Sequence, residues 1–513
     1  MAAVQALSAP TVEVRSKGLL TFGIMAAVIM QVLDTTIANV ALPHMRSSLG
    51  ASQDEINWVL TSYIVAAAIA TPLTGWFADR FGRKELMVAA VFGFTFASLL
   101  CGIAGSLEQM VLFRVVQGVF GAMLVPLAQA TMMDINPRER LGQAMAIFGA
   151  GIMIGPIVGP TLGGWLTESF NWRAVFLVNL PIGILAFFML FALMPKSEIK
   201  LRKFDFFGFG LLALAVACVQ LLLDRGQSVG WFDSPEIWTY LILAISGAWV
   251  FVIHCATVSE PFVDLAMFKD RNFATGLVMI FVIGISLFSG LALLPPMLQN
   301  LMGLPVIETG LVMGPRGIGT MVSMILVGRL VARYDARILV FGGTLLMAYS
   351  LYMMTEFDIV MGTGPIMISG LLQGIGMGFV FIPLNTLAFA TINARFRVDA
   401  TAMFSLVRNV GSGVGISIVT AVLANMQIIN HAELAERITL DSGAVRDFAA
   451  AAGGFSRVMS TIEGMVSQQA AMLAFLDDFK LMMWITLASV PIILLLRRPK
   501  VAVKPDPAHA MAE

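Results

Sequence analysis

The sequence is poor in charge. Only 12% of its 513 residues are Asp, Glu, Lys or Arg, about half the 25% that is usual in soluble domains. Lys plus Arg and Asp plus Glu number 32 each, so the chain has no net positive charge with which to attract nucleic acid. So little charge cannot cover the surface of a soluble domain, and the apolar composition also excludes a disordered chain.

Metal, disulfide and nucleotide sites have no support in the sequence either. The three cysteines, Cys101, Cys218 and Cys255, form no C-x-x-C pair, and the four histidines form no cluster, so we expect neither a disulfide framework nor a metal site. No Gly directly precedes a Lys anywhere in the chain, which excludes the phosphate-binding P-loop G-x-x-x-x-G-K-[ST]. We therefore expect no cofactor and no enzymatic activity.

What the chain has in excess is apolar sequence. Hydrophobic residues make up 58% of it, in runs that fit the roughly 20 residues a helix needs to cross a bilayer. The first run follows Arg15 and Lys17 and is too long for a signal peptide, so we interpret it as an uncleaved first helix. Hydropathy predicts an all-α polytopic membrane protein with fourteen spans, at residues 19–43, 56–78, 86–105, 109–133, 142–167, 173–194, 205–223, 236–256, 272–299, 309–328, 338–355, 362–390, 401–427 and 479–496.

The basic residues give the chain an orientation. Most of the 32 Lys and Arg residues lie in the N-terminal tail, in every second predicted loop and in the C-terminal tail. Cytoplasmic loops are enriched in Lys and Arg, so both termini are predicted to be cytoplasmic. This alternation supports the count of fourteen, because one missed or extra helix would move every later loop to the other side.

One predicted outer loop, 428–477, is longer and more polar than the others. Residues at helical spacing, most of them apolar, predict an amphipathic helix within it; they are Val458, Ile462, Met465, Gln469, Leu473 and Leu476. This pattern leaves two interpretations open, a lid packed on the membrane surface and a docking surface for another protein.

A patterned turn connects the second and third predicted helices. It reads Gly75-Trp-Phe-Ala-Asp79-Arg80-Phe-Gly82-Arg83-Lys84, and this G-x-x-x-D-R-x-G-R-K pattern resembles the signature loop of the major facilitator superfamily. Orientation in the membrane would explain its basic residues, but not Asp79 or the two glycines. The resemblance implies an ionic latch between helix bundles, which biases inward-facing against outward-facing states. Its residues would be Gly75, Asp79, Arg80, Gly82, Arg83 and, at the end of the fourth helix, Asp134.

Two further helices carry motifs of the same kind. In the fourth helix, Arg114-Val-Val-Gln117-Gly118 resembles the superfamily motif in which an intramembrane arginine assists proton transfer. In the fifth, a repeat of small residues resembles the motif found mostly in antiporting exporters. Small residues at this spacing let helices approach closely, so a generic packing face is the alternative. The residues are Gly151, Gly155, Pro156, Gly159, Pro160, Gly163 and Gly164.

The first helix narrows the resemblance. Leu33-Asp34-Thr35-Thr36-Ile37-Ala38-Asn39, together with Ile382-Pro383-Leu384-Asn385-Thr386, is similar to the fourteen-span drug:proton antiporters of the EmrB/QacA family, and more to the EmrB type. The similarity covers nearly the whole chain. It implies a periplasmic adaptor protein and an outer-membrane channel as partners, besides protons and amphipathic drugs, and this favours the docking interpretation of 428–477. Arg316 is a departure, since not all relatives have an arginine there.

Asp34 is the candidate for proton coupling. Ionisable residues inside membrane spans are expensive and usually functional, and Asp34 is the only acidic residue deep within a predicted span. We expect it to carry the proton with the help of Arg114; a purely structural ion pair between the two is the alternative. Arg408 could hold an anionic substrate, balance Asp34 or extend towards the cytoplasmic interface. The candidate substrate cavity comprises Gln31, Asn39, Gln117, Asn385, Arg408 and Asn409.

Together these features predict a proton-coupled multidrug exporter in a bacterial inner membrane, as the inner-membrane subunit of a tripartite pump. The expected parts are a cytoplasmic tail (1–18), a six-helix bundle (19–194), two inserted helices with flanking loops (195–271), a second six-helix bundle that includes loop 428–477 (272–496) and a cytoplasmic tail (497–513). Two alternatives stay open: a dedicated exporter of one metabolite, fatty acid or siderophore, and a non-transporting membrane sensor or scaffold.

Overall fold

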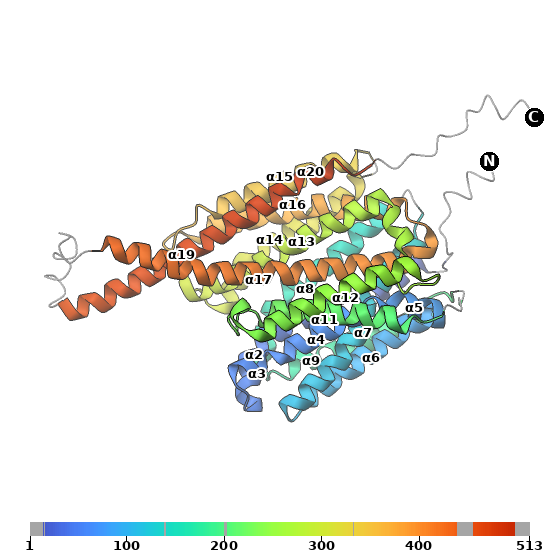
Figure 1. Ribbon diagram of the computed structural model, residues 1–513, viewed down its shortest axis with the longest axis horizontal. Helices are drawn as coiled ribbons and strands as arrows, with labels where there is room; N and C mark the ends of the chain where they lie inside the picture. The colour runs from blue at the N-terminus through green and yellow to red at the C-terminus, as the bar shows by residue number, and fades with distance from the viewer. Residues whose placement is uncertain are drawn as a thin grey trace, which may run out of the picture.

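The computed structural model describes residue 14 and residues 16–137, 140–197, 199, 203–331, 333–438 and 455–497. Its long helices run side by side, most of them roughly along one axis (Figure 1). They are α2 (Lys17–Leu49), α4 (Trp58–Ala70), α5 (Leu73–Phe81), α6 (Arg83–Ile103), α7 (Leu107–Asp134), α8 (Leu141–Ser169), α10 (Asn179–Leu193), α11 (Phe206–Arg225), α12 (Pro235–Thr257), α13 (Arg271–Pro296), α14 (Val306–Leu330), α15 (Ala336–Met354), α16 (Thr363–Ala390), α17 (Arg397–Arg437) and α19 (Phe455–Ala488). Short helical pieces lie near their ends, namely α3 (Gln53–Ile56), α9 (Ala174–Leu177), η2 (Trp231–Asp233), η3 (Leu265–Lys269), η4 (Met297–Leu301), η5 (Ala394–Phe396) and α20 (Val490–Ile493).

The helices form two groups that pack mainly within themselves. In the first group, α2 packs on α8 and α10, α4 packs on α7, and α6 packs on α7 and α10. In the second, α14 and α15 pack on α16, and α17 packs on α13 and α19. The groups meet most extensively where α8 packs on α14. Helices α11 and α12 pack as a pair, and α11 also contacts α4 of the first group and α17 of the second.

The carboxylate of Asp205 joins the start of α11 to the last turn of α12. Asp205 precedes α11 and accepts the backbone N–H of Gly208 at 2.8 Å, which caps the helix. It also accepts hydrogen bonds from His254 Nε2 on α12 at 2.8 Å and from the Phe262 N–H at 3.0 Å. Burial alone would raise the pKa of Asp205, but these hydrogen bonds together hold it below its usual value.

Twelve of the described helices are long and apolar enough to cross a membrane, or thirteen if α4 and α5 form one bent span. These two helices meet at an angle of 58°, and Pro72 lies at the break, where it cannot donate the backbone hydrogen bond of a continuous helix. The prediction of an all-helical, multi-pass membrane protein is confirmed. The predicted fourteenth span, 479–496, lies on α19 and α20, which do not meet the same criteria, so the count of fourteen stays a prediction.

Much of the predicted outer loop 428–477 is helical in its described part. Helix α17 continues to Arg437 and α19 begins at Phe455. Where these two helices extend past the other helices, at the left of Figure 1, they form a projection. We call residues 428–437 and 455–467 the hairpin.

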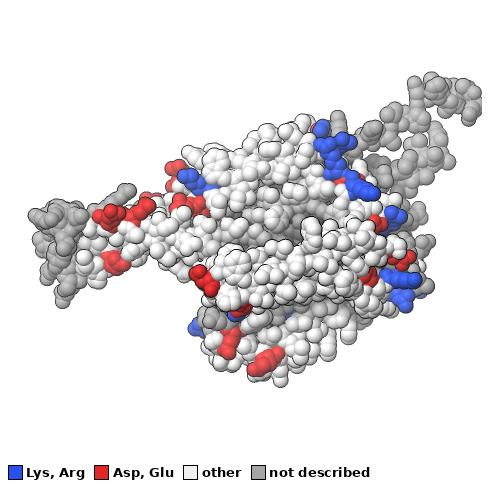
Figure 2. Space-filling view, viewed as in Figure 1, with Lys and Arg blue, Asp and Glu red and all other residues white. Residues whose placement is uncertain are grey.

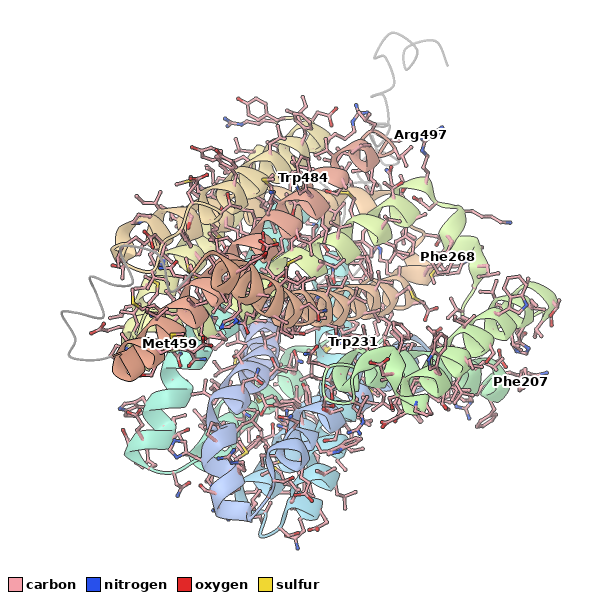
Figure 3. The ribbon with its side chains drawn as sticks, turned by 60° about the vertical axis from the view of Figure 1, so that its left-hand side comes forward. Phe207, Trp231, Phe268, Met459, Trp484 and Arg497 are labelled. Atoms are coloured by element: carbon pink, nitrogen blue, oxygen red, sulfur yellow. The ribbon has the colours of Figure 1, made fainter. Side chains whose placement is uncertain are left out.

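The predicted amphipathic helix lies within α19. Met465, Gln469 and Leu473 of its stripe are exposed, whereas Val466 and Ala470, which lie beside the stripe, are buried. Helix α17 packs on α19 and contributes to which face is covered. Exposed apolar side chains therefore remain on this part of the molecule, and Figure 3 labels one of them, Met459, on the hairpin.

Charge is segregated along the length of the molecule. Figure 2 shows most of the visible Lys and Arg side chains at the end opposite the hairpin, and a wide uncharged zone between the two ends. We call the end opposite the hairpin the basic end; Arg497, labelled in Figure 3, lies there. Large apolar side chains are exposed along the helices, among them Phe188, Trp249 and Leu311. An apolar belt between charged ends is the surface expected of a protein embedded in lipid.

Candidate functional site

A buried ion pair joins α2 to α7. Arg114 Nη1 donates to Asp34 Oδ2 at 2.6 Å, and the two residues are 1% and 0% exposed. Gln117, one turn further along α7, accepts from Arg114 Nη1 at 2.7 Å and donates to Asp34 Oδ1 at 2.9 Å. The Arg114 Nε–H donates to the Val59 carbonyl of α4 at 3.0 Å. The pair therefore also fixes α4 against α7.

Two further elements close the site. Asn179, the first residue of α10, donates to Asp34 Oδ1 at 2.8 Å and to Ser98 Oγ of α6 at 2.9 Å. The Tyr63 ring of α4 covers the Arg114 guanidinium, with Cζ 4.2 Å from the ring centroid, a distance that allows cation–π attraction. The Tyr63 hydroxyl accepts a hydrogen bond from Gln31 at 3.0 Å. We call Asp34, Arg114, Gln117, Asn179 and Tyr63 the Asp34 network.

This geometry connects the proton occupancy of Asp34 to packing. In the state described, the carboxylate accepts hydrogen bonds from Arg114, Gln117 and Asn179. Protonation would remove its charge and leave a buried arginine without its counter-ion, a change that costs several kcal/mol in low-dielectric surroundings. Gain of a proton is therefore expected to loosen α2 from α7 and α10. The predicted ion pair exists, and its role in coupling stays a prediction.

The predicted cavity residues differ in their surroundings, and their place in one substrate cavity stays a prediction. Gln117 belongs to the Asp34 network, and Gln31 lies at its edge. Asn385 of α16 is 1% exposed and accepts from Gln129 of α7 at 2.8 Å. This hydrogen bond joins the two helix groups, so Asn385 contributes to the contact between them.

The other three cavity candidates differ in their surroundings. Asn39 and Asn409 are exposed, and Asn39 donates to the Thr35 carbonyl at 3.3 Å. Arg408 is half-buried, and its Nε is buried without a hydrogen-bond partner. Asp34 is paired with Arg114 rather than with Arg408. No carboxylate of the described residues forms an ion pair with Arg408.

Several predicted latch residues meet at the basic end of the molecule, where α6 and α17 begin and α7 ends. Asp134 is 5% exposed and accepts hydrogen bonds from the guanidinium groups of Arg83 and Arg397. Asp79 and Asp399 lie near enough to Arg83 to interact with its charge. Gly75 packs directly against Asp399, where a larger residue would clash. Because Arg397 begins α17, this cluster ties the two helix groups together, and they are closed against each other at this end.

The other residues of the signature turn act through the backbone. Gly82 has φ +90°, in the region that side chains rarely adopt, and its N–H closes α5 by bonding to the Ala78 carbonyl. Arg80 is exposed, and the ion pairs of Asp134 are with Arg83 and Arg397 instead. The glycines of the turn thus shape the backbone that brings Asp79 near Arg83.

The small-residue repeat of α8 faces α2. A side chain on Gly155 would lie 2.9 Å from the Val32 carbonyl carbon, and one on Gly163 would lie 3.2 Å from the Ile37 carbonyl oxygen. Gly151 and Gly159 lie equally close to α2 side chains. Thr36 Oγ1 donates to the Gly155 carbonyl at 3.1 Å. The repeat therefore holds the helix that carries Asp34, while Pro156, Pro160 and Gly164 are only partly buried.

Several partners in these sites could not be picked out from the sequence. Asn179 was missed because a neutral amide at a helix start is common, and Arg397 because it counted only as a basic residue of a loop. Asp478 of α19 was also missed: it is 0% exposed, and neither carboxylate oxygen has a hydrogen-bond partner. Asp478 lies one residue before the predicted fourteenth span, so it was counted as a loop residue and not as an acidic residue inside a span.

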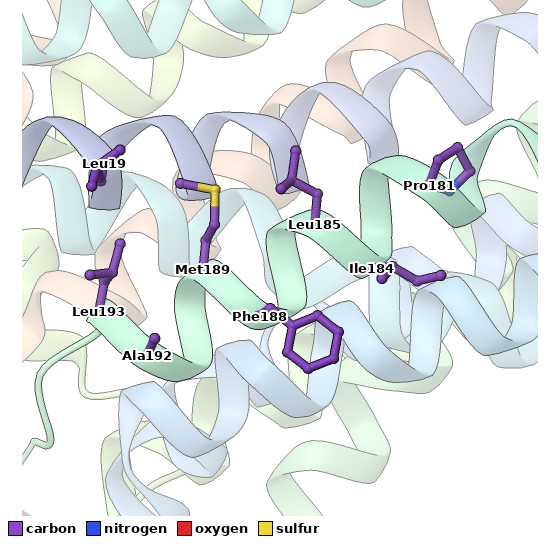
Figure 4. Close-up of a pocket in the computed structure, with 8 residues that line it drawn as sticks. All are labelled: Leu19, Pro181, Ile184, Leu185, Phe188, Met189, Ala192 and Leu193. Atoms are coloured by element: carbon purple, nitrogen blue, oxygen red, sulfur yellow. The ribbon is translucent and has the colours of Figure 1, made fainter.

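The exposed surface of the helix bundle has an apolar groove, which lies apart from these polar sites. Figure 4 shows it between the start of α2, at Leu19, and α10. All eight residues that line it are apolar, and Phe188 and Leu19 are more than half exposed. A groove of this kind suits a lipid acyl chain and offers no group for coupling or for polar recognition.

Comparison with known proteins gives consistent matches. A family model described as Major Facilitator Superfamily matches residues 24–416. The chain is 33% identical over 486 residues to the fatty acid resistance protein FarB of Neisseria gonorrhoeae, a match that covers 93% of this chain and 96% of FarB. It is 35% identical over 423 residues to the multidrug export protein EmrB of Haemophilus influenzae, covering 82% of this chain and 83% of that protein. It is 31% identical over 454 residues to EmrB of Escherichia coli K12, covering 88% and 89%.

Among solved structures, the crystal structure of the human organic anion transporter MFSD10 (TETRAN) matches with a TM-score of 0.58. The match covers 91% of this chain and 99% of that chain, at 13% sequence identity. At this identity the likeness shows the fold alone.

Proposed function

The chain belongs to the major facilitator superfamily, and from this premise we propose that it is a proton-coupled exporter of amphipathic compounds in a bacterial inner membrane. Relatives named multidrug export proteins and a fatty acid resistance protein, matched over most of their length, support export of this kind. The structural observation that supports the proposal is the Asp34 network, in which partners on α7 and α10 hold one buried carboxylate.

Coupling would follow from competition between Arg114 and a proton for Asp34. When Asp34 is paired, α2 is tied to α7 and α10; when it is protonated, those ties are weakened. A proton taken up from the outer side would thus favour the rearrangement that opens the basic end, and release of that proton inside would restore the pair. The Asp134 cluster would act as the latch of the same cycle, since it closes the basic end only while α6 and α7 meet α17.

The topology completes the proposal. We propose fourteen spans with both termini in the cytoplasm, with the basic end facing the cytoplasm and the hairpin facing outwards. Residues 19–194 and 272–496 would form the two bundles that move against each other, and residues 195–271 the inserted pair. The segregation of Lys and Arg towards one end supports this orientation.

The hairpin is the proposed docking element for a periplasmic adaptor, which would link the exporter to an outer-membrane channel. Ile428, Met459 and Met465 are 70%, 48% and 57% exposed on it, and apolar side chains on a projecting element mark interaction surfaces. Met465→Glu should abolish co-purification with the adaptor while the protein stays inserted. Val360→Glu is the matched control, because Val360 is 87% exposed in the loop after α15, outside the hairpin. Adaptor binding unchanged by Met465→Glu, or lost equally with Val360→Glu, would contradict this role.

A second candidate is a dedicated exporter of one fatty acid or similar metabolite, which the similarity to FarB favours. A susceptibility panel in a host without its own pumps separates the two, because a multidrug exporter raises resistance to several unrelated compounds. Purified protein in proteoliposomes tests the shared core of both. An imposed pH gradient should drive uphill movement of an amphipathic substrate, and its failure to do so for every compound of the panel would favour a sensor or scaffold instead.

A further inference from the structure

The second helix group contains a buried arginine that has no counter-ion among the described residues. Arg316 of α14 is 6% exposed, and its Nη2 donates to the Leu287 carbonyl of α13 at 3.1 Å. Its Nη1 is buried and has no hydrogen-bond partner. No carboxylate among the described residues forms an ion pair with it, in contrast to Arg114 of the first group. An isolated cation in a membrane interior costs several kcal/mol and is usually retained for function.

Glycines of two neighbouring helices pack closely against Arg316. A Cβ placed on Gly290 of α13 would lie 3.1 Å from Arg316 Nη1 and 3.2 Å from Nη2. A Cβ on Gly370 of α16 would lie 3.4 Å from the Arg316 Cβ, and Gly374 packs against the Arg316 backbone. The guanidinium therefore packs directly against the α13 backbone at Gly290, where even a methyl group would crowd it.

A neighbouring amide is also left without partners. Gln373 lies between Gly370 and Gly374 on the same stretch of α16; it is 2% exposed, and both its amide atoms lack hydrogen-bond partners. Buried polar groups are nearly always hydrogen-bonded, so a buried amide with both atoms unsatisfied requires an explanation.

The first helix group contains a comparable buried arginine and glutamine, and there both contact a carboxylate. Helix α7, the fourth of that group when α4 and α5 count as one bent helix, carries Gln117-Gly118, and Gln117 bonds both to Arg114 and to Asp34. The corresponding helix of the second group, α16, carries Gln373-Gly374, with Gly370 standing three residues before the glutamine where α7 has Arg114. In the second group the arginine comes from α14 instead, and no aspartate within the described ranges forms an ion pair with it. The second group thus has a buried glutamine and a buried arginine, without a paired carboxylate in the part of the chain that the structure describes.

We propose that Arg316, with Gln373 beside it, binds the carboxylate of an amphipathic substrate. This inference rests on the proposed export function and names the substrate class, an organic acid with an apolar body. The planar guanidinium offers Nη1 to a carboxylate oxygen, and the amide of Gln373 adds a second donor. A bound carboxylate would provide Arg316 with the counter-ion that the described part of the chain does not supply.

Equilibrium binding to the purified full-length protein in nanodiscs tests this directly. The probes are dodecanoate and its uncharged methyl ester. Gly290→Asp would place a carboxylate of the chain beside Arg316, and Gly290→Asn is its matched control with the same shape and no charge. We expect Gly290→Asp to raise the Kd for dodecanoate at least tenfold over Gly290→Asn, with the Kd for the ester equal in both. Arg316→Gln should produce a similar loss for dodecanoate, and Arg316→Lys a smaller one.

The outcomes separate recognition from structure. Equal Kd values for dodecanoate in Gly290→Asp and Gly290→Asn would overturn the proposal, as would loss of ester and dodecanoate binding together in Arg316→Gln. Loss in Arg408→Gln with none in Arg316→Gln would assign the carboxylate to Arg408 and also overturn it. Binding is measured without a gradient, so failure of proton-coupled export in proteoliposomes would refute the proposed function and leave this result standing.

Discussion

A pH gradient should drive accumulation of a neutral substrate. The logarithm of its concentration ratio across the membrane should rise by one for each unit of pH difference, a slope of one. The Asp34 network contains one carboxyl group, since its other members are the guanidinium of Arg114, the phenol of Tyr63 and the amides of Gln117 and Asn179, and we expect this carboxyl group to carry one proton. One proton per substrate supplies about 1.4 kcal/mol for each pH unit when the membrane potential is zero, which corresponds to a tenfold concentration ratio. Two pH units should therefore give about a hundredfold ratio.

The assay uses proteoliposomes whose potential is clamped at zero with potassium and valinomycin. The logarithm of the steady-state substrate ratio is plotted against the pH difference. Asp34→Asn keeps the shape of the side chain but cannot release a proton, so its slope should be zero. Asp358→Asn makes the same chemical change at an exposed loop position and should keep the slope at one.

Two results would refute this reasoning. A slope of one in Asp34→Asn would move coupling away from the Asp34 network. A slope of two in the unmodified protein would require a second titrating carboxylate, and Asp478, which is fully buried with both oxygens unpartnered, would be the first to test.

Three further predictions concern the latch, the α8 repeat and the inserted pair. Asp134→Asn removes the charge that holds two arginines, so labelling of a cysteine placed between α7 and α17 should rise several-fold from the basic side; unchanged labelling would exclude a latch. Gly155→Ala forces a side chain against the α2 backbone and should lower stability by about 1–3 kcal/mol in a thermal melt, whereas Gly314→Ala meets nothing within 4 Å and should not. Asp205→Ala should lower stability by about 1–2 kcal/mol through loss of the α11 cap. Because the pKa of Asp205 is lowered by folding, its contribution is present above its unfolded pKa and is lost as pH falls through the lowered value.

The parts of the site that could be predicted are those whose residue types are rare in their surroundings. Asp34 and Arg114 stand out because charge in an apolar run is costly, and the structure pairs them at 2.6 Å. The glycines of α8 stand out by their spacing, and they do lie against α2. In both cases a local pattern carries the information, and the fold brings the two helices together.

The rest depends on contacts between distant segments. Asn179 is an ordinary amide until α10 brings it to Asp34, and Arg397 looks like any cytoplasmic arginine until α17 meets α7. The stripe on α19 was predicted from the sequence of that helix alone, whereas the burial of its residues also depends on the packing of α17 against it. The surroundings of Arg316 could not be predicted, since they include glycines on α13 and α16 that are far apart in the sequence.

The asymmetry between the two helix groups has an energetic consequence for export. If a carboxylate leaves on Arg316 while a proton enters on Asp34, two charges move with the membrane potential in each cycle. At about 2.3 kcal/mol for one charge across 100 mV, this adds about 4.6 kcal/mol, enough for more than a thousandfold ratio at about 1.4 kcal/mol per tenfold. A neutral substrate would gain half of that energy, and a monovalent cation none, because its outward charge cancels that of the proton. Steady-state ratios in proteoliposomes should therefore respond to an imposed potential most for dodecanoate, less for a neutral compound and not at all for a cation. A dodecanoate ratio that responds to the potential no more than the ratio of the neutral compound would mean that the acid crosses uncharged, and an uncharged acid has no need of Arg316.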